Sequence, residues 1–198
     1  MFESLDSGQL QALYASGLLG DLRRCAVELD LTKVDRDQYQ KILGFDPSVF
    51  IVKMGGSEDT DQITAALGFP FNEWITQINF PLKPSDVLWK DEIEIVDPGT
   101  SFIEEEGLKI LKDKGLGRPT YEHAIRFAEQ HLKTTTSEKK PYVIFLHEAW
   151  RDPDRDRRVV CLRRRADSRR LGLDYPDNRF HDYCVLAGVR PRRQSSAA

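Results

Sequence analysis

The sequence predicts an α+β fold in which a mostly helical N-terminal region packs on a C-terminal antiparallel β-meander. Apolar residues recur at helical spacing in several segments before residue 135, and they alternate with period two after residue 141. Pro and Gly separate these segments. We therefore expect a helical region with short strands over 1–135, a meander over 141–190 and a basic tail over 191–198. Because a lone meander needs one face covered, we expect helices of 100–133 to pack on it as one compact unit.

Short helices are predicted first from capping patterns. Asp6 and Asp35 each stand at an N-cap position with Gln three residues later, and an apolar stripe predicts a helix over 17–29 between them. Val49–Val52 is typical of a short buried strand, and Ile63 and Leu67 mark the helix that follows it.

The later half of this region combines helices with one strand. Helical spacing predicts a helix within Phe71–Phe80, and alternation predicts a strand over Glu92–Val96. Ser101 and Glu104 match a capping box at the start of the next helix. The Glu run at 104–106 then complements the positive helix end, so we assign it no active-site role. A long amphipathic helix is expected from about Pro119 to Lys133.

The meander is predicted as four strands separated by turn residues. They are Tyr142–Trp150, Arg157–Arg165, Arg170–Tyr175 and roughly Asp182–Arg190.

The net charge of −3 conceals a split along the chain. Residues 1–150 carry 16 basic and 25 acidic side chains, whereas residues 151–198 carry 13 basic and 7 acidic ones. All 13 of these later basic residues are Arg, whose planar fork of donors suits phosphates and carboxylates. The split therefore indicates either mutual neutralisation within one fold or a surface for an anionic partner.

The sharper interpretation is a sheet whose arginines contact phosphates and whose rings stack on bases, as on platforms for single-stranded nucleic acid. The alternative interpretation is structural: the rings belong to the core, and the arginines are solvated or paired with acids of the helices. The residues proposed to bind an anion are Arg151, Arg157, Arg163, Arg165, Arg169, Arg170, Arg179, Trp150 and Tyr175.

A hydrolytic or nuclease site is the second possibility. His147 and His181 could supply acid–base chemistry if their strands came together, and Cys184 lies three residues beyond His181. The four His show no HxH, HExxH or CxxC spacing, so no metal site is expected. The Gly55-Gly56 turn departs from the P-loop pattern, and no cofactor is expected.

Cellular context is read from cysteines and apolar runs. The odd number of cysteines fits reduced thiols in a cytoplasm, no leader pattern is visible at Met1–Gln11, and apolar runs are too short to span a membrane. The leading hypothesis is a non-enzymatic cytoplasmic module that binds nucleic acid or an acidic protein surface. The alternatives are the His-based hydrolase and a regulatory or immunity-type protein whose acidic helices bind a basic partner.

Overall fold

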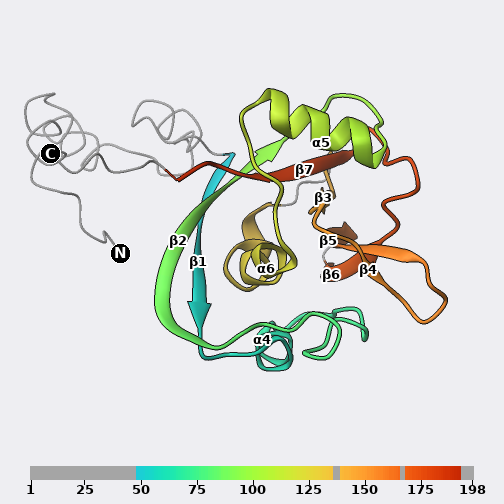
Figure 1. Cartoon of the computed structure of the whole chain (residues 1–198). Coiled ribbons are helices and arrows are strands. Elements are labelled where there is room, and N and C mark those ends of the chain that lie inside the picture. The colour runs from blue at the N-terminus through green and yellow to red at the C-terminus, as the bar shows by residue number, and fades with distance from the viewer. Residues whose placement is uncertain (1–47, 136–138, 166–167, 193–198) are drawn as a thin grey trace, which may run out of the picture. The chain divides into compact units, whose positions relative to one another are not determined.

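The computed structural model describes residues 48–135, 139–165 and 168–192. Their main feature is one seven-stranded sheet that curls into a half-barrel (Figure 1). The strand order is β1-β2-β7-β3-β5-β4, and β6 pairs with β5. The bounds are β1 Val49–Gly56, β2 Ser85–Val96, β3 Tyr142–Ile144, β4 Trp150–Arg151, β5 Arg157–Arg165, β6 Ser168–Asp174 and β7 Cys184–Val189.

The predicted fold class, a helical region packed on a β-meander, is therefore wrong. β1 and β2 come from the region expected to be mostly helical, and they form a long antiparallel pair in the same sheet. The expected meander order also fails, because β7 pairs antiparallel with β2 and parallel with β3 instead of following β6. The antiparallel pairings of β5 with β3, β4 and β6 do match the first three strands of the predicted meander. The predicted helices before residue 44 lie outside the described residues.

Helix α6 (Tyr121–Thr135) fills the concave side of the sheet, as Figure 1 shows. This helix confirms the amphipathic pattern predicted from about Pro119. Ala124, Ile125 and Phe127 are fully buried in a cluster with residues of β1, β5 and β6. The sheet curls around this apolar stripe, which removes it from water.

Helix α5 (Glu104–Asp113) covers the convex side, where its Leu111 packs in a second apolar cluster with residues of β3, β5 and β7. The predicted cap is displaced by two residues. The amide of Ile103 donates to the Glu106 carboxylate at 2.9 Å, so the cap does not use Ser101 with Glu104. Glu104 is consequently available for other contacts.

Helix α4 (Thr60–Ala66) and the segment after it close one end of the concave side (Figure 1). Asp59 caps α4 and forms a capping box with Gln62. The helix predicted within 71–80 is absent, because the Asn72 side chain accepts the Trp74 amide at 2.9 Å and turns the chain. Ile75 is buried in the core, whereas Ile78 is 90% exposed.

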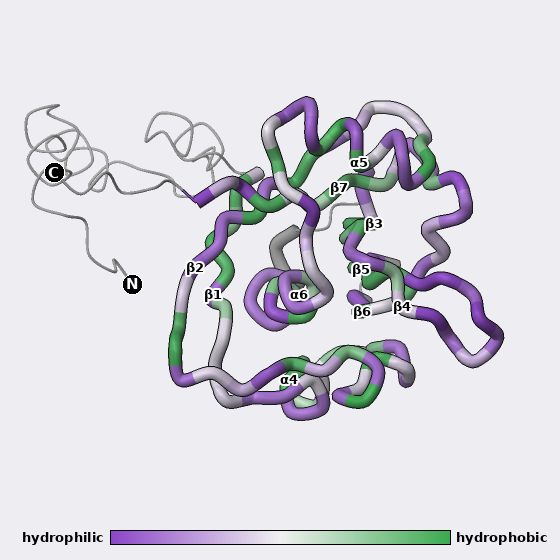
Figure 2. Tube along the Cα trace, in the orientation of Figure 1, coloured by the Kyte–Doolittle hydropathy of each residue, from purple (hydrophilic) through white to green (hydrophobic). Residues whose placement is uncertain are grey.

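Turns between the strands are strongly polar. The residues that join β4 to β5 form a hydrophilic loop at the right of Figure 2. Asp152 anchors this loop by accepting the Asp156 amide and the Arg158 guanidinium. Among the described residues, no helix has both the length and the apolar composition that a membrane crossing requires.

Candidate functional site

The β5–β6 hairpin brings four of the arginine-rich positions together in two facing pairs. Arg163 lies directly opposite Arg170, and Arg164 lies directly opposite Arg169. The first pair shares the convex face with Cys161, and the second shares the concave face with Leu162, because side chains alternate along a strand. We call Arg163, Arg164, Arg169 and Arg170 the arginine ladder.

Counter-charges are unevenly distributed over the ladder. Arg163 contacts Asp174 at 3.2 Å and donates to the Leu173 carbonyl. Arg170 is exposed and has no ion pair with any residue that the structure describes. Arg169 is half-buried, and its Nε is buried without an acceptor among the described residues. The guanidinium groups of Arg169 and Arg170 on β6 therefore have hydrogen-bond donors that no described residue accepts.

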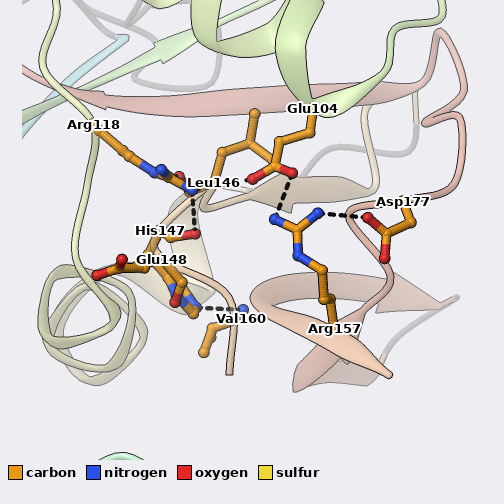
Figure 3. Close-up of polar contacts among 8 residues, drawn as sticks. All are labelled: Glu104, Arg118, Leu146, His147, Glu148, Arg157, Val160 and Asp177. Atoms are coloured by element: carbon orange, nitrogen blue, oxygen red, sulfur yellow. Dashed lines mark hydrogen bonds and ion pairs between the residues drawn. The ribbon is translucent and has the colours of Figure 1, made fainter. Parts of the chain in front are cut away.

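The other predicted arginines fall in different places. Arg157 bridges Glu104 at 2.7 Å and Asp177, as Figure 3 shows, and Arg179 lies 3.5 Å from Glu106. Arg151 is exposed at the opposite end of β5 from the ladder and donates to the Arg155 carbonyl at 3.0 Å. The side chain of Arg165 lies outside the described part. Arg151, Arg157 and Arg179 therefore do not form one continuous surface with the ladder.

The two aromatic residues of the predicted platform are engaged within the fold. Trp150 packs against Phe80 with ring centroids 5.4 Å apart, and against Trp74 at 6.0 Å. The Arg158 guanidinium lies 3.4 Å from the centroid of the Tyr175 ring and covers one of its faces. Base stacking on Trp150 would thus require its ring contacts to be displaced, whereas Tyr175, which is 37% exposed, keeps one face that Arg158 does not cover.

His147 is 1% exposed and makes two hydrogen bonds (Figure 3). Its Nε2 accepts the Val160 amide at 2.8 Å, so Nδ1 carries the proton and donates to the Glu148 carbonyl at 2.7 Å. Burial lowers the pKa of His147 to about 4. Both ring nitrogens are therefore occupied by the backbone, and the imidazole is neutral at pH 7.

His147 and His181 are not brought together. β3 and β7 run parallel, His147 follows the end of β3, and His181 precedes the start of β7, so they lie beyond opposite ends of the strand pair. His181 is exposed and stacks on Tyr183. Cys184 is buried, and burial raises the pKa of its thiol to about 11, which disfavours the reactive thiolate.

A different titratable cluster, which sequence reasoning missed, lies where α6 begins beside β2. Asp91 and His123 are 7% and 9% exposed, and His123 Nε2 is 3.2 Å from Asp91 Oδ2. His123 Nδ1 is 2.7 Å from the hydroxyl oxygen of Thr120, which is an exposed residue. At 100° per residue His123 falls on the polar side of α6, although the structure buries it. The Thr-x-x-His spacing at the start of the helix was the one local pattern that could indicate contact between Thr120 and His123.

Asp91 is surrounded by donors. Arg192 donates to it at 2.8 and 3.3 Å, and the Trp89 indole donates at 3.0 Å. Burial raises the pKa of Asp91, but the hydrogen bonds from Arg192 and Trp89 more than offset this effect and leave it below the ordinary value. The pKa of His123 is lowered, because its burial outweighs the attraction of Asp91. At neutral pH the pair is thus a carboxylate beside a neutral imidazole.

Two adjoining cavities lie over this cluster. The larger has a volume of about 630 Å³, the smaller about 340 Å³, and both are lined by Asp91, Arg190, Pro191 and Arg192. His123, Gly117 and Arg118 line the smaller one. Cavities of this size hold small molecules in other proteins. Among the described residues, no three His, Cys, Asp or Glu side chains gather as a metal site would require.

Comparison with models of protein families, with curated proteins and with solved structures finds no match to this chain. A function for this protein must therefore be inferred from the geometry of its own residues.

Proposed function

We propose that this chain is a binding module that contacts the phosphate backbone of nucleic acid through the arginine ladder of β5 and β6. The observation that carries the proposal is the pair of direct Arg–Arg oppositions, Arg163 with Arg170 and Arg164 with Arg169. Like charges directly opposite each other destabilise an antiparallel ladder. Because the two pairs lie on opposite faces of the hairpin, phosphates bound on each face would offset the repulsion within the pair on that face.

The chemistry of the side chains favours phosphate as the ligand. Arg presents a rigid fork that binds phosphate oxygens through two parallel hydrogen bonds. Arg169 and Arg170 have donors that the described residues leave unused. Since Trp150 and Tyr175 are engaged in the fold, binding would depend on phosphate contacts more than on base stacking. We therefore expect little sequence preference.

Other hypotheses gain less support. The acids Glu92, Glu94, Glu104 and Glu106 each contact an arginine, which leaves them less able to form an acidic surface for a basic partner. The hydrolase built on His147 and His181 lacks the proximity that shared acid–base chemistry requires.

The proposal is tested by titrating fluorescent single- and double-stranded oligonucleotides with the full chain at about 50 and 200 mM salt. Affinity should fall steeply as salt rises, because phosphate contacts release counterions. Replacing Arg169 and Arg170 together by Gln should weaken binding to all sequences and reduce the single-strand salt slope by roughly 1.4, the value for two lost phosphate contacts.

Arg151→Gln is the matched control, because Arg151 is also exposed but lies at the other end of β5. Its affinity and salt slope should equal those of the wild type. Negligible binding by the wild type at low salt, or an unchanged slope in the double variant, would overturn the proposal.

A further inference from the structure

We propose that Thr120, His123 and Asp91 form an acyl-transfer site that hydrolyses small carboxylic esters. This site is independent of the arginine ladder and rests on the chain of contacts from the Thr120 hydroxyl to His123 Nδ1, 2.7 Å, and from His123 Nε2 to Asp91, 3.2 Å. A nucleophile, a base and a group that orients the base lie in line.

The hydrogen bonds determine the tautomer. The Thr120 amide donates to His123 Nδ1 at 3.1 Å, so Nδ1 carries a lone pair and the ring proton is on Nε2, where it is donated to Asp91. Nδ1 can therefore accept the proton of the Thr120 hydroxyl. Asp91 is a positioning residue that holds the ring and stabilises the imidazolium formed during the reaction.

Donors for a developing oxyanion lie next to Thr120. α6 begins at Tyr121, and the amides at the first positions of an α-helix have no acceptor within the helix. Those of Tyr121 and Glu122 have no acceptor among the described residues either, whereas the His123 amide is 3.3 Å from Thr120 Oγ1. Unpaired amides beside the nucleophile suit the negative charge of a tetrahedral intermediate.

The reaction proceeds in two steps. Thr120 Oγ attacks the ester carbonyl carbon while its proton moves to His123 Nδ1, and the ester C–O bond then breaks as the leaving alcohol takes that proton. In the second step Nδ1 takes a proton from water, the hydroxide attacks the acyl-threonine, and Thr120 leaves with the proton. One ester and one water thus give one acid and one alcohol. The cavity of about 340 Å³ is lined by His123 and Asp91 and not by Thr120, and the exposed position of Thr120 leaves its hydroxyl open to an ester from solvent.

The same contacts also cap α6, so the test must separate chemistry from capping. The full chain is incubated with p-nitrophenyl acetate, p-nitrophenolate release is followed, and the acetylated peptide is identified by mass spectrometry. The wild type should carry one acetyl group on Thr120. Thr120→Asp keeps a good N-cap acceptor but removes the hydroxyl, so it should remain folded and lose both acetylation and turnover.

Further variants complete the test. Thr120→Ser retains the hydroxyl and should retain acetylation. His123→Gln should lower the acetylation rate by about 100-fold or more, as expected for loss of a general base. The wild-type rate should fall in acid with a midpoint below the ordinary His pKa, since burial lowers the pKa of His123. Absence of acetyl on Thr120 in the wild type, or equal reactivity of Thr120→Asp, would refute the site. Neither result bears on oligonucleotide binding by the ladder.

Discussion

At the scale of single residues, His147 supplies a hydrogen-bond acceptor that β5 otherwise lacks. β3 pairs with β5 at Cys161–Arg163 and β4 pairs with it at Arg157–Arg158, which leaves a gap between them. In that gap the Val160 amide donates to His147 Nε2. A buried amide without an acceptor would cost about 1–3 kcal/mol, so the neutral imidazole is a structural part of the sheet.

The charge of His147 therefore links stability to pH. Its pKa is about 4 in the folded chain and about 6.5 when unfolded, so the unfolded state takes up the proton first as pH falls. The stabilisation is complete above pH 6.5 and is lost progressively down to about pH 4, by about 3 kcal/mol. Urea unfolding of the wild type and of His147→Gln at about pH 7.5, about pH 5.5 and about pH 4 measures this change in the free energy of unfolding.

The glutamine variant separates His147 from other titrating groups, because Gln accepts a hydrogen bond without gaining charge. Its free energy of unfolding should fall less between neutral and acid pH than that of the wild type. Equal pH dependence of the two proteins would contradict the role of His147.

Residue types were predictable from the sequence, but their partners were not. The abundance of Arg after residue 150 indicated either an anion-binding surface or pairing with acids of the helices, and it could not show that Arg157 meets Glu104, which is 53 positions away. Likewise, His123 and Asp91 are 32 positions apart on different elements. Periodicity describes which face a residue occupies along its own element and carries no information about the element packed against that face.

At the scale of elements, the helices follow their local signals better than the strands do. α6 contains one long apolar stripe, and α5 carries acidic residues at its start and Lys112 near its end. β2 escaped prediction over Ser85–Asp91, because the mostly exposed, mixed residues of this part do not alternate cleanly. The parallel β3–β7 contact depends on a long crossover, which no local pattern encodes.

The packing of α5 on the sheet depends on the absence of a side chain at Gly188 of β7. A Cβ there would lie 2.8 Å from Leu111 Cδ2 and 2.9 Å from Leu116 Cβ. Because Leu116 Cβ is attached directly to the backbone, the chain itself must move. We expect Gly188→Ala to destabilise the fold by about 1–3 kcal/mol, measured by denaturant unfolding.

Gly172→Ala on β6 is the control for this prediction, since its Cβ would lie 3.4 Å or more from Arg163 and Cys161. It should leave stability almost unchanged. Similar losses in both variants would mean that glycine in the strands matters for backbone reasons rather than for the approach of α5.

At the scale of the whole described unit, the curl of the sheet leaves β1 as an edge strand facing α6. The Gln130 side chain pairs with Lys53 as a strand would, accepting from its amide at 2.8 Å and donating to its carbonyl at 2.9 Å. His131 Nε2 lies 2.8 Å from the Ile51 carbonyl. Polar side chains of a helix thus satisfy an edge that could otherwise pair with another chain.

Gln130→Ala should therefore open the β1 edge without disturbing the core. Loss of two hydrogen bonds predicts a destabilisation of about 1–2 kcal/mol and faster hydrogen exchange at the Lys53 amide. The exposed edge should also promote association that grows with concentration, which size-exclusion chromatography with light scattering detects. Glu122→Ala, on the same helix but without a hydrogen bond to β1 among the described contacts, should change neither the exchange at Lys53 nor the association. Unaltered exchange at Lys53 in Gln130→Ala would show that the edge is protected by the apolar packing of α6 alone.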